Sequence, residues 1–119
     1  MARYRCENNN KKTEITILSI QQGGTSSAGE ISKTINYTVE EKGEYIADAF
    51  GYAYPTSNCY CKINGEAATP VNYVANAAGH NCSYGLWKMD CKKGDVIKIY
   101  AYAKGHGEGG VVVRLAKIN

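Results

Sequence analysis

The chain has little of what an α-helical protein uses. It contains only three leucines, two methionines and two glutamines, although straight-chain side chains of this kind favour helices. Ten tyrosines, ten isoleucines, seven valines and seven threonines are present instead. β-branched and aromatic side chains suit the half-buried surface of a pleated sheet. The composition therefore predicts an all-β protein, and the length of 119 residues predicts one domain over 1–119.

Long apolar runs are also missing. No stretch approaches the roughly 18 consecutive apolar residues of a transmembrane helix, and the polar N-terminus has no apolar core of a signal peptide. The net charge of +3 is too small to indicate nucleic-acid binding. We therefore expect synthesis in the cytoplasm without a signal peptide, followed by a role on a virion or an extracellular surface after release. We expect neither membrane insertion nor a nucleic-acid partner.

Histidine is scarce, which limits the catalytic arrangements available. Only His80 and His106 occur, and no serine or cysteine has the spacing of a nucleophilic triad. The glycine-rich run 105–110 is not followed by a helix or a Lys-Ser pair, so it is no phosphate-binding loop. It is expected to be a hairpin tip, and the alternative is a binding loop with His106 and Glu108 at its apex. We expect no enzyme, no catalytic residue and no cofactor; a small hydrolase with an unrecognised site is the alternative.

The cysteines are five in number, at positions 6, 59, 61, 82 and 91. An odd count without a signal peptide favours reduced thiols, packed as small apolar groups in a core. Disulfides formed after release from the cell are an alternative. Cys59-x-Cys61 and His80-x-Cys82 contain the ligands of a Cys₃His zinc set, but structural zinc sites use wider spacings. No metal site is therefore expected.

Alternating polar and apolar residues predict the strands. Residues 31–39 alternate with a period of two, as expected of a strand with one buried and one wet face. In 46–54, large side chains alternate with small ones, which would allow close packing on that side. Asn64-Gly65 is the clearest hairpin signal, because both residues tolerate positive φ. Further strands are expected at 14–20, 58–63, 70–75, 83–89, 95–103 and 110–118.

Turn residues separate these segments at short intervals. They are expected at Gly23-Gly24, at 55–58, at Gly94-Asp95 and at 105–110. Residues 1–30 are predicted to hold an N-terminal strand followed by a flexible Gly/Ser-rich connection over 21–30. About eight short strands with frequent turns predict an antiparallel β-sandwich that is jelly-roll-like.

A family resemblance lies between residues 35 and 118. The stretch 35–50 resembles the opening strand, turn and strand of tumour-necrosis-factor-like and complement-type jelly-roll modules. The Lys-Ile-Asn-Gly of 62–65 is similar to their mid-domain hairpin. The stretch 86–99, with its Lys-Gly-Asp turn, is similar to a later strand pair, and 111–118 to the closing strand. Such modules also occur at phage tail-fibre tips and in bacterial proteins.

The resemblance implies a non-enzymatic module, a homo-oligomer and in particular a homotrimer, that binds a surface carbohydrate or a protein receptor. Tyrosine offers a large rigid face with a hydroxyl, which suits contacts to sugars and proteins. The alternative is a purely structural subunit of a phage or bacterial assembly, whose tyrosines mediate self-association. The residues expected to bind the ligand are Tyr52, Tyr54, Tyr60, Asn81, Tyr84 and Trp87.

Overall fold

The computed structural model describes residues 14–25, 29–74 and 82–119. In this part of the chain there are nine strands and no helix, so there is also no helix that could span a membrane. Seven strands have nine to eleven residues, longer than expected. The strands are β1 (Ile15–Thr25), β2 (Gly29–Thr38), β3 (Gly43–Tyr52), β4 (Pro55–Ile63), β5 (Glu66–Ala67), β6 (Asn72–Val74), β7 (Cys82–Cys91), β8 (Val96–Gly105) and β9 (Gly109–Ile118).

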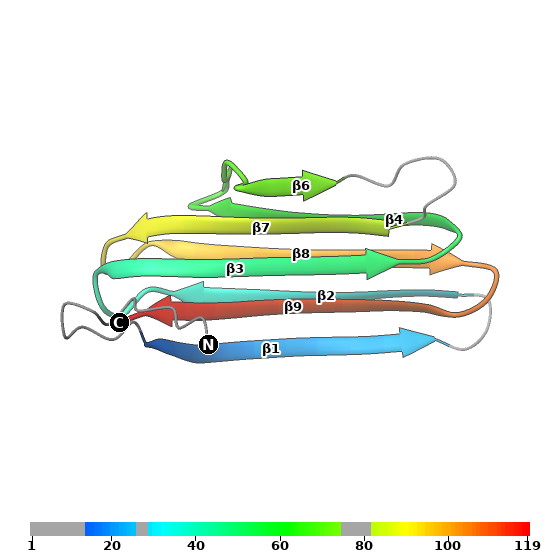
Figure 1. The fold of residues 1–119 in the computed structure, drawn as a ribbon, viewed down its shortest axis with the longest axis horizontal. Helices are drawn as coiled ribbons and strands as arrows, with labels where there is room; N and C mark the ends of the chain where they lie inside the picture. Colours follow the sequence, from blue (N-terminus) through cyan, green and yellow to red (C-terminus); the bar gives the residue numbers. More distant parts are fainter. Residues whose placement is uncertain (1–13, 26–28, 75–81) are drawn as a thin grey trace, which may run out of the picture.

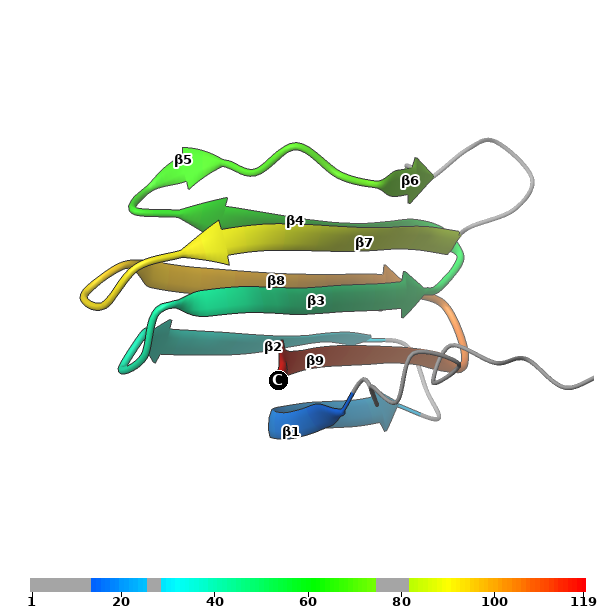
Figure 2. The ribbon, with the colours of Figure 1, turned by 60° about the vertical axis from the view of Figure 1, so that its left-hand side comes forward.

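Two antiparallel sheets pack face to face, which confirms the predicted β-sandwich. One has five strands in the order β1-β9-β3-β7-β6 and the other has four in the order β2-β8-β4-β5 (Figure 1). β1 pairs with β9, β2 with β8, β3 with β7 and β4 with β5. A jelly roll has pairs of this kind, because it can be described as one long antiparallel hairpin that folds over into two sheets. The strand order is therefore jelly-roll-like. Between β5 and β6 the chain crosses from one sheet to the other (Figure 2).

The core lies between the sheets, and period-two alternation supplies it. In β3 the alanines at 47 and 49 face inward, and the large side chains of Ile46 and Phe50 face outward. The small inward side chains of β3 allow the two sheets to pack closely, as the pattern in 46–54 predicted. Across from them, β8 contributes Ile97 and Ile99, which are fully buried.

The indole of Trp87 is the largest fully buried side chain between the sheets. Its side chain on β7 is 2% exposed and lies over Gly85 of the same strand. A Cβ at Gly85 would be 2.1 Å from Cη2 of the indole. Gly85 is therefore the residue that makes room for the largest side chain between the sheets.

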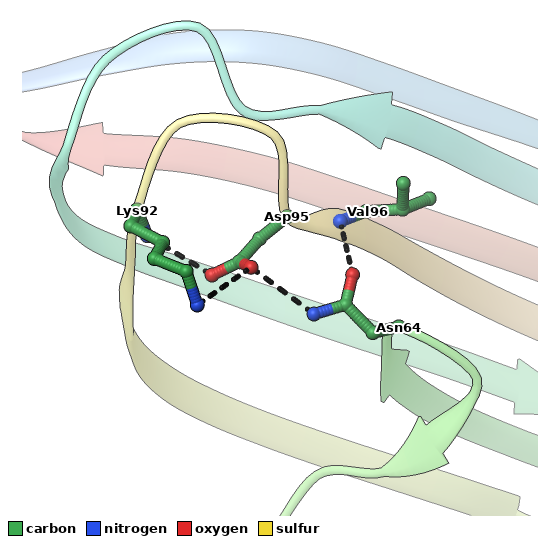
Figure 3. Close-up of polar contacts among 4 residues, drawn as sticks. All are labelled: Asn64, Lys92, Asp95 and Val96. Atoms are coloured by element: carbon green, nitrogen blue, oxygen red, sulfur yellow. Dashed lines mark hydrogen bonds and ion pairs between the residues drawn. The ribbon is translucent and has the colours of Figure 1, made fainter.

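A polar cluster joins two turns at one end of the sandwich (Figure 3). Asn64 (φ 52°) and Gly65 (φ 84°) form the predicted two-residue turn between β4 and β5. The Asn64 amide donates to Asp95 Oδ1 at 3.0 Å, and the backbone N–H of Lys92 donates to Asp95 Oδ2 at 2.9 Å. The Val96 N–H in turn donates to Asn64 Oδ1 at 2.9 Å. The cluster therefore joins the β4–β5 turn to the loop that precedes β8.

Three turn and loop expectations differ from the structure. β1 runs through Gly23-Gly24 to Thr25 and β2 begins at Gly29, because 21–25 pair with β9. The expected flexible connection therefore does not extend over all of 21–30. The expected turn over 55–58 is the start of β4, which pairs with β8 from Pro55 onward. The run 105–110 is no hairpin tip, since β8 and β9 belong to different sheets.

Candidate binding surfaces

The outer face of the five-stranded sheet carries many apolar side chains, together with the charged residues Glu44, Asp48, Lys88, Asp90 and Arg114. On β1, Ile15, Ile17 and Ile20 have exposed fractions of 54%, 57% and 50%. β1 pairs with β9 and β9 pairs with β3 in a register that places further apolar side chains beside these isoleucines, across the width of the sheet. We call this surface the apolar face; it consists of Ile15, Ile17, Ile20, Ile46, Phe50, Tyr52, Val74, Tyr84, Leu86, Val112 and Ala116.

Among the described residues, two ion pairs interrupt the apolar face: Lys88 of β7 contacts Glu44 of β3 at 3.3 Å, and Arg114 contacts Asp48. Arg114 of β9 donates through Nε to Asp48 Oδ1 on β3 at 2.8 Å, and through its second nitrogen to Oδ2. This bidentate contact raises the pKa of Arg114, chiefly through the hydrogen bond to Asp48. Ile15, Ile17 and Ile46 surround the pair in a shallow hollow of about 220 Å³. The pair neutralises itself, so it adds hydrogen-bonding geometry without net charge.

A second hollow lies at the far end of the same face. It has a volume of about 460 Å³ and is lined by glycines and by the rings of Phe50 and Tyr52. The two rings have centroids 6.2 Å apart. Gly24 of β1 and Gly110 of β9 lie opposite each other in the register, so no side chains fill this part of the sheet surface. The hollow could take an aromatic or sugar ring against Tyr52.

The outer face of the four-stranded sheet carries a different set of residues. Tyr60 of β4 stacks on Tyr100 of β8 with ring centroids 4.8 Å apart, and Tyr100 lies parallel to Tyr102 at 6.5 Å. The Tyr102 hydroxyl donates to Glu30 Oε2 at 2.8 Å, which raises the pKa of Tyr102. We call this surface the tyrosine face; it consists of Tyr60, Lys62, Lys98, Tyr100 and Tyr102 with the exposed polar residues Thr34, Asn36 and Asn58 beside them.

A small pocket opens at the edge of the core beside β6. It has a volume of about 230 Å³ and is lined by Cys59, Cys61, Tyr73 and Trp87, among others. The Tyr73 hydroxyl donates to the Cys59 carbonyl at 3.2 Å. Burial raises the pKa of Cys59 to about 11 and that of Cys61 to about 12. Both thiols are therefore protonated at neutral pH and are poor nucleophiles.

The cysteines that the structure describes are all free thiols. Cys59, Cys61 and Cys91 are buried, which confirms the interpretation of these three as small core residues. Cys82 lies on β7 beside the inward-facing Ser83 and so faces outward from the other sheet. The Cys59-x-Cys61 pair and Cys82 therefore do not share a face, and His80 lies outside the described residues. In the described ranges no group of three potential ligands could hold a metal ion.

The six residues predicted to bind a ligand do not form one site. Tyr52 and Tyr84 lie on the apolar face, and Tyr60 lies on the tyrosine face. Tyr54 is 63% exposed at the end of the sandwich, with its ring 5.9 Å from that of His106. Trp87 differs most from the expectation, because its indole is enclosed between the sheets and offers no open face for stacking. The remaining residue, Asn81, lies outside the described residues.

Sequence reasoning missed Tyr100, Lys62 and Lys98 as members of a shared surface. Each residue occupies an outward position of a strand, which the period-two pattern shows. Their proximity depends on the register of β4 against β8, which pairs Tyr60 with Tyr100 and Lys62 with Lys98. In the sequence, only the large number of tyrosines indicated an aromatic surface.

No protein-family model matches the chain, and no curated protein has a similar sequence. Function is therefore inferred from the chemistry of the two outer faces of the sandwich.

Proposed function

We propose that the protein is a non-enzymatic binding module that works as a homo-oligomer and recognises a carbohydrate or a protein receptor on a surface. The observation that carries this proposal is the apolar face, on which three isoleucines of β1 are at least half exposed. Monomeric proteins rarely leave a contiguous apolar surface of this kind uncovered. A role on a virion or an extracellular surface belongs to the same proposal.

A second copy of this chain is the partner that best fits the apolar face. The Arg114–Asp48 pair offers a donor and an acceptor on the same surface, so two copies can exchange hydrogen bonds there. A surface that complements itself favours symmetric association. The charge of the pair is balanced, which removes the repulsion that two like-charged copies would meet. The family resemblance implies a trimer instead, in which the apolar face would pack against a different surface of the neighbouring copy.

The experiment is a measurement of solution mass by light scattering over a range of concentrations. We expect the wild-type mass to be a multiple of 12.9 kDa. The double substitution Ile17→Lys and Ile20→Lys places two charges in the proposed interface. It should weaken association by more than about tenfold, because each buried unpaired charge is costly.

A matched control places the same charges on the other sheet. Ser32 and Thr38 are exposed positions of β2, so Ser32→Lys with Thr38→Lys should leave the mass unchanged. Circular dichroism establishes that each variant is folded. A wild-type protein that stays monomeric at every concentration, or an Ile17/Ile20 variant that associates as well as wild type, would refute the proposal.

The alternative is a purely structural subunit of a phage or bacterial assembly, whose tyrosine-rich surfaces mediate self-association. It differs in predicting no ligand on any surface. Under the alternative the stacked tyrosines of the tyrosine face are a contact between copies, and under the binding module they contact the ligand. Ligand titrations of the assembled protein therefore separate the two functions.

A further inference from the structure

Two lysines converge on one tyrosine ring of the tyrosine face. Lys62 of β4 and Lys98 of β8 lie directly opposite each other in the sheet. Their ammonium nitrogens lie 5.0 Å and 5.9 Å from the centroid of the Tyr60 ring. Like charges directly opposite on neighbouring strands destabilise a sheet. Among the described residues neither lysine forms an ion pair with a carboxylate. An anion placed between them would offset this repulsion.

Aromatic and polar groups surround the lysine pair. Tyr60 stacks on Tyr100, which extends the aromatic surface across the two strands. On the other side of β8, Thr34 pairs with Tyr100 and Asn36 pairs with Lys98, and both are exposed. Aromatic rings cover the C–H face of a sugar, and hydroxyl and amide groups hydrogen-bond to its hydroxyls. The surface therefore matches a sugar ring that carries an acidic group.

We propose that the tyrosine face binds an acidic saccharide, with Lys62 and Lys98 holding its carboxylate or sulfate group. Tyr60 and Tyr100 contact the sugar ring, and Thr34 and Asn36 orient its hydroxyls. This inference rests on the proposed function and names its ligand class. The binding surface lies on the sheet opposite the apolar face, so assembly leaves it open.

An acidic saccharide fits this surface better than a nucleic acid does. Base stacking needs open aromatic faces along a continuous basic track. Here the carboxylate of Glu30, which is bonded to Tyr102 on the same face, interrupts any such track and repels phosphate. The two converging lysines provide one localised anion site. A single acidic sugar can occupy such a site.

The test titrates the protein with matched pairs of neutral and acidic oligosaccharides. The pairs are lactose with 3′-sialyllactose, and a fully desulfated heparin hexasaccharide with its sulfated form. Calorimetry measures affinity, and NMR shifts of backbone amides locate the contact on β4 and β8. We expect the acidic member of at least one pair to bind about tenfold more tightly than its neutral partner, because only the acidic member makes charge contacts to the two lysines. The first pair tests a carboxylate and the second a sulfate.

Two variants and one control assign the contact to the proposed residues. Lys62→Gln with Lys98→Gln should remove the preference for the acidic member, a loss of about tenfold in affinity. Tyr60→Thr should weaken binding of both members of the pair. The control, Lys42→Gln with Lys104→Gln, removes the same charge from an exposed turn and from the far end of β8 and should change nothing.

Each outcome has a defined meaning. The proposal is overturned if no acidic probe binds, if the lysine variant binds as tightly as wild type, or if a short single-stranded oligonucleotide binds at these residues more tightly than every sugar. Equal binding of neutral and acidic sugars overturns the role of the lysines but supports the binding module. The solution mass is measured separately, so an assembled protein that ignores all sugars refutes this inference and leaves the homo-oligomer intact.

Discussion

At the scale of single residues, the packing of the core is most sensitive at Gly85, where there is no room for a side chain. Trp87 lies two positions further along β7, and its indole covers the place that a Cβ would occupy. A strand normally tolerates alanine well. At Gly85 the requirement for glycine comes from the neighbouring indole of Trp87 and not from the backbone conformation, since φ at Gly85 is not positive.

We expect Gly85→Ala to destabilise the protein by about 1–3 kcal/mol, because the added methyl group overpacks a full core. Urea unfolding followed by Trp87 fluorescence measures the change. Gly107→Ala is the matched control, since a Cβ there meets nothing within 4 Å, and it should change stability by less than about 0.5 kcal/mol. An equal effect of the two substitutions would contradict the steric explanation.

Asp95 supplies the other prediction at this scale. The backbone N–H of Lys92 and then the Asn64 amide stabilise its carboxylate, which lowers its pKa below the ordinary value of 3.8. A group with a lowered folded pKa adds stability above the unfolded pKa and loses that stability as the pH falls through the folded pKa. Asp95→Asn should therefore lower the melting temperature at pH 7, and the difference from wild type should shrink below pH 3.8. A difference that stays constant with pH would show that the charge of Asp95 contributes nothing.

At the scale of elements, the two-residue period decides which side chains of β4 are reactive. Cys59 and Cys61 face the core, and Tyr60 and Lys62 face outward. The same strand therefore contributes thiols to the interior and binding groups to the tyrosine face. The interior location also raises the pKa of both thiols.

We expect Cys59 and Cys61 to be alkylated by iodoacetamide only as fast as the protein unfolds. Pulse alkylation at pH 8 with peptide mapping measures each site separately. At this pH, pKa values of about 11 and 12 leave little thiolate even where the reagent could reach the sulfur. Modification that becomes complete long before unfolding would show that β4 does not hold these side chains in the core.

At the scale of the whole molecule, the sandwich separates two kinds of surface. The five-stranded sheet presents isoleucines and balanced ion pairs, and the four-stranded sheet presents tyrosines and two lysines, Lys62 and Lys98, that form no ion pair among the described residues. Because the sheets lie back to back, one surface can pack against other copies while the other remains open to a ligand. An assembled protein would repeat the tyrosine face, so binding to a dense glycan surface would gain from multivalency.

Much of the fold was readable from the order of the residues. Alternation over 31–39 and 46–54 identified strands and their inward faces, and Asn64-Gly65 identified a two-residue turn, since these signals depend on neighbouring residues alone. The alternation could not reveal that 21–25 continue β1, because their partners on β9 lie about 90 positions away. Local sequence was also insufficient for the run 105–110, which connects strands of two different sheets and does not form a hairpin.

The binding surfaces depended on tertiary structure to a greater degree. The number of tyrosines and the exposed period-two positions indicated an aromatic surface. The six residues predicted to bind a ligand do not form one surface, however, and Trp87 belongs to the core. Register between strands that are distant in sequence brought Lys62 to Lys98 and Tyr60 to Tyr100. Local sequence determines which face of a strand a side chain occupies, whereas pairing across the sheet, which responds to the packing of the whole core, determines its neighbours.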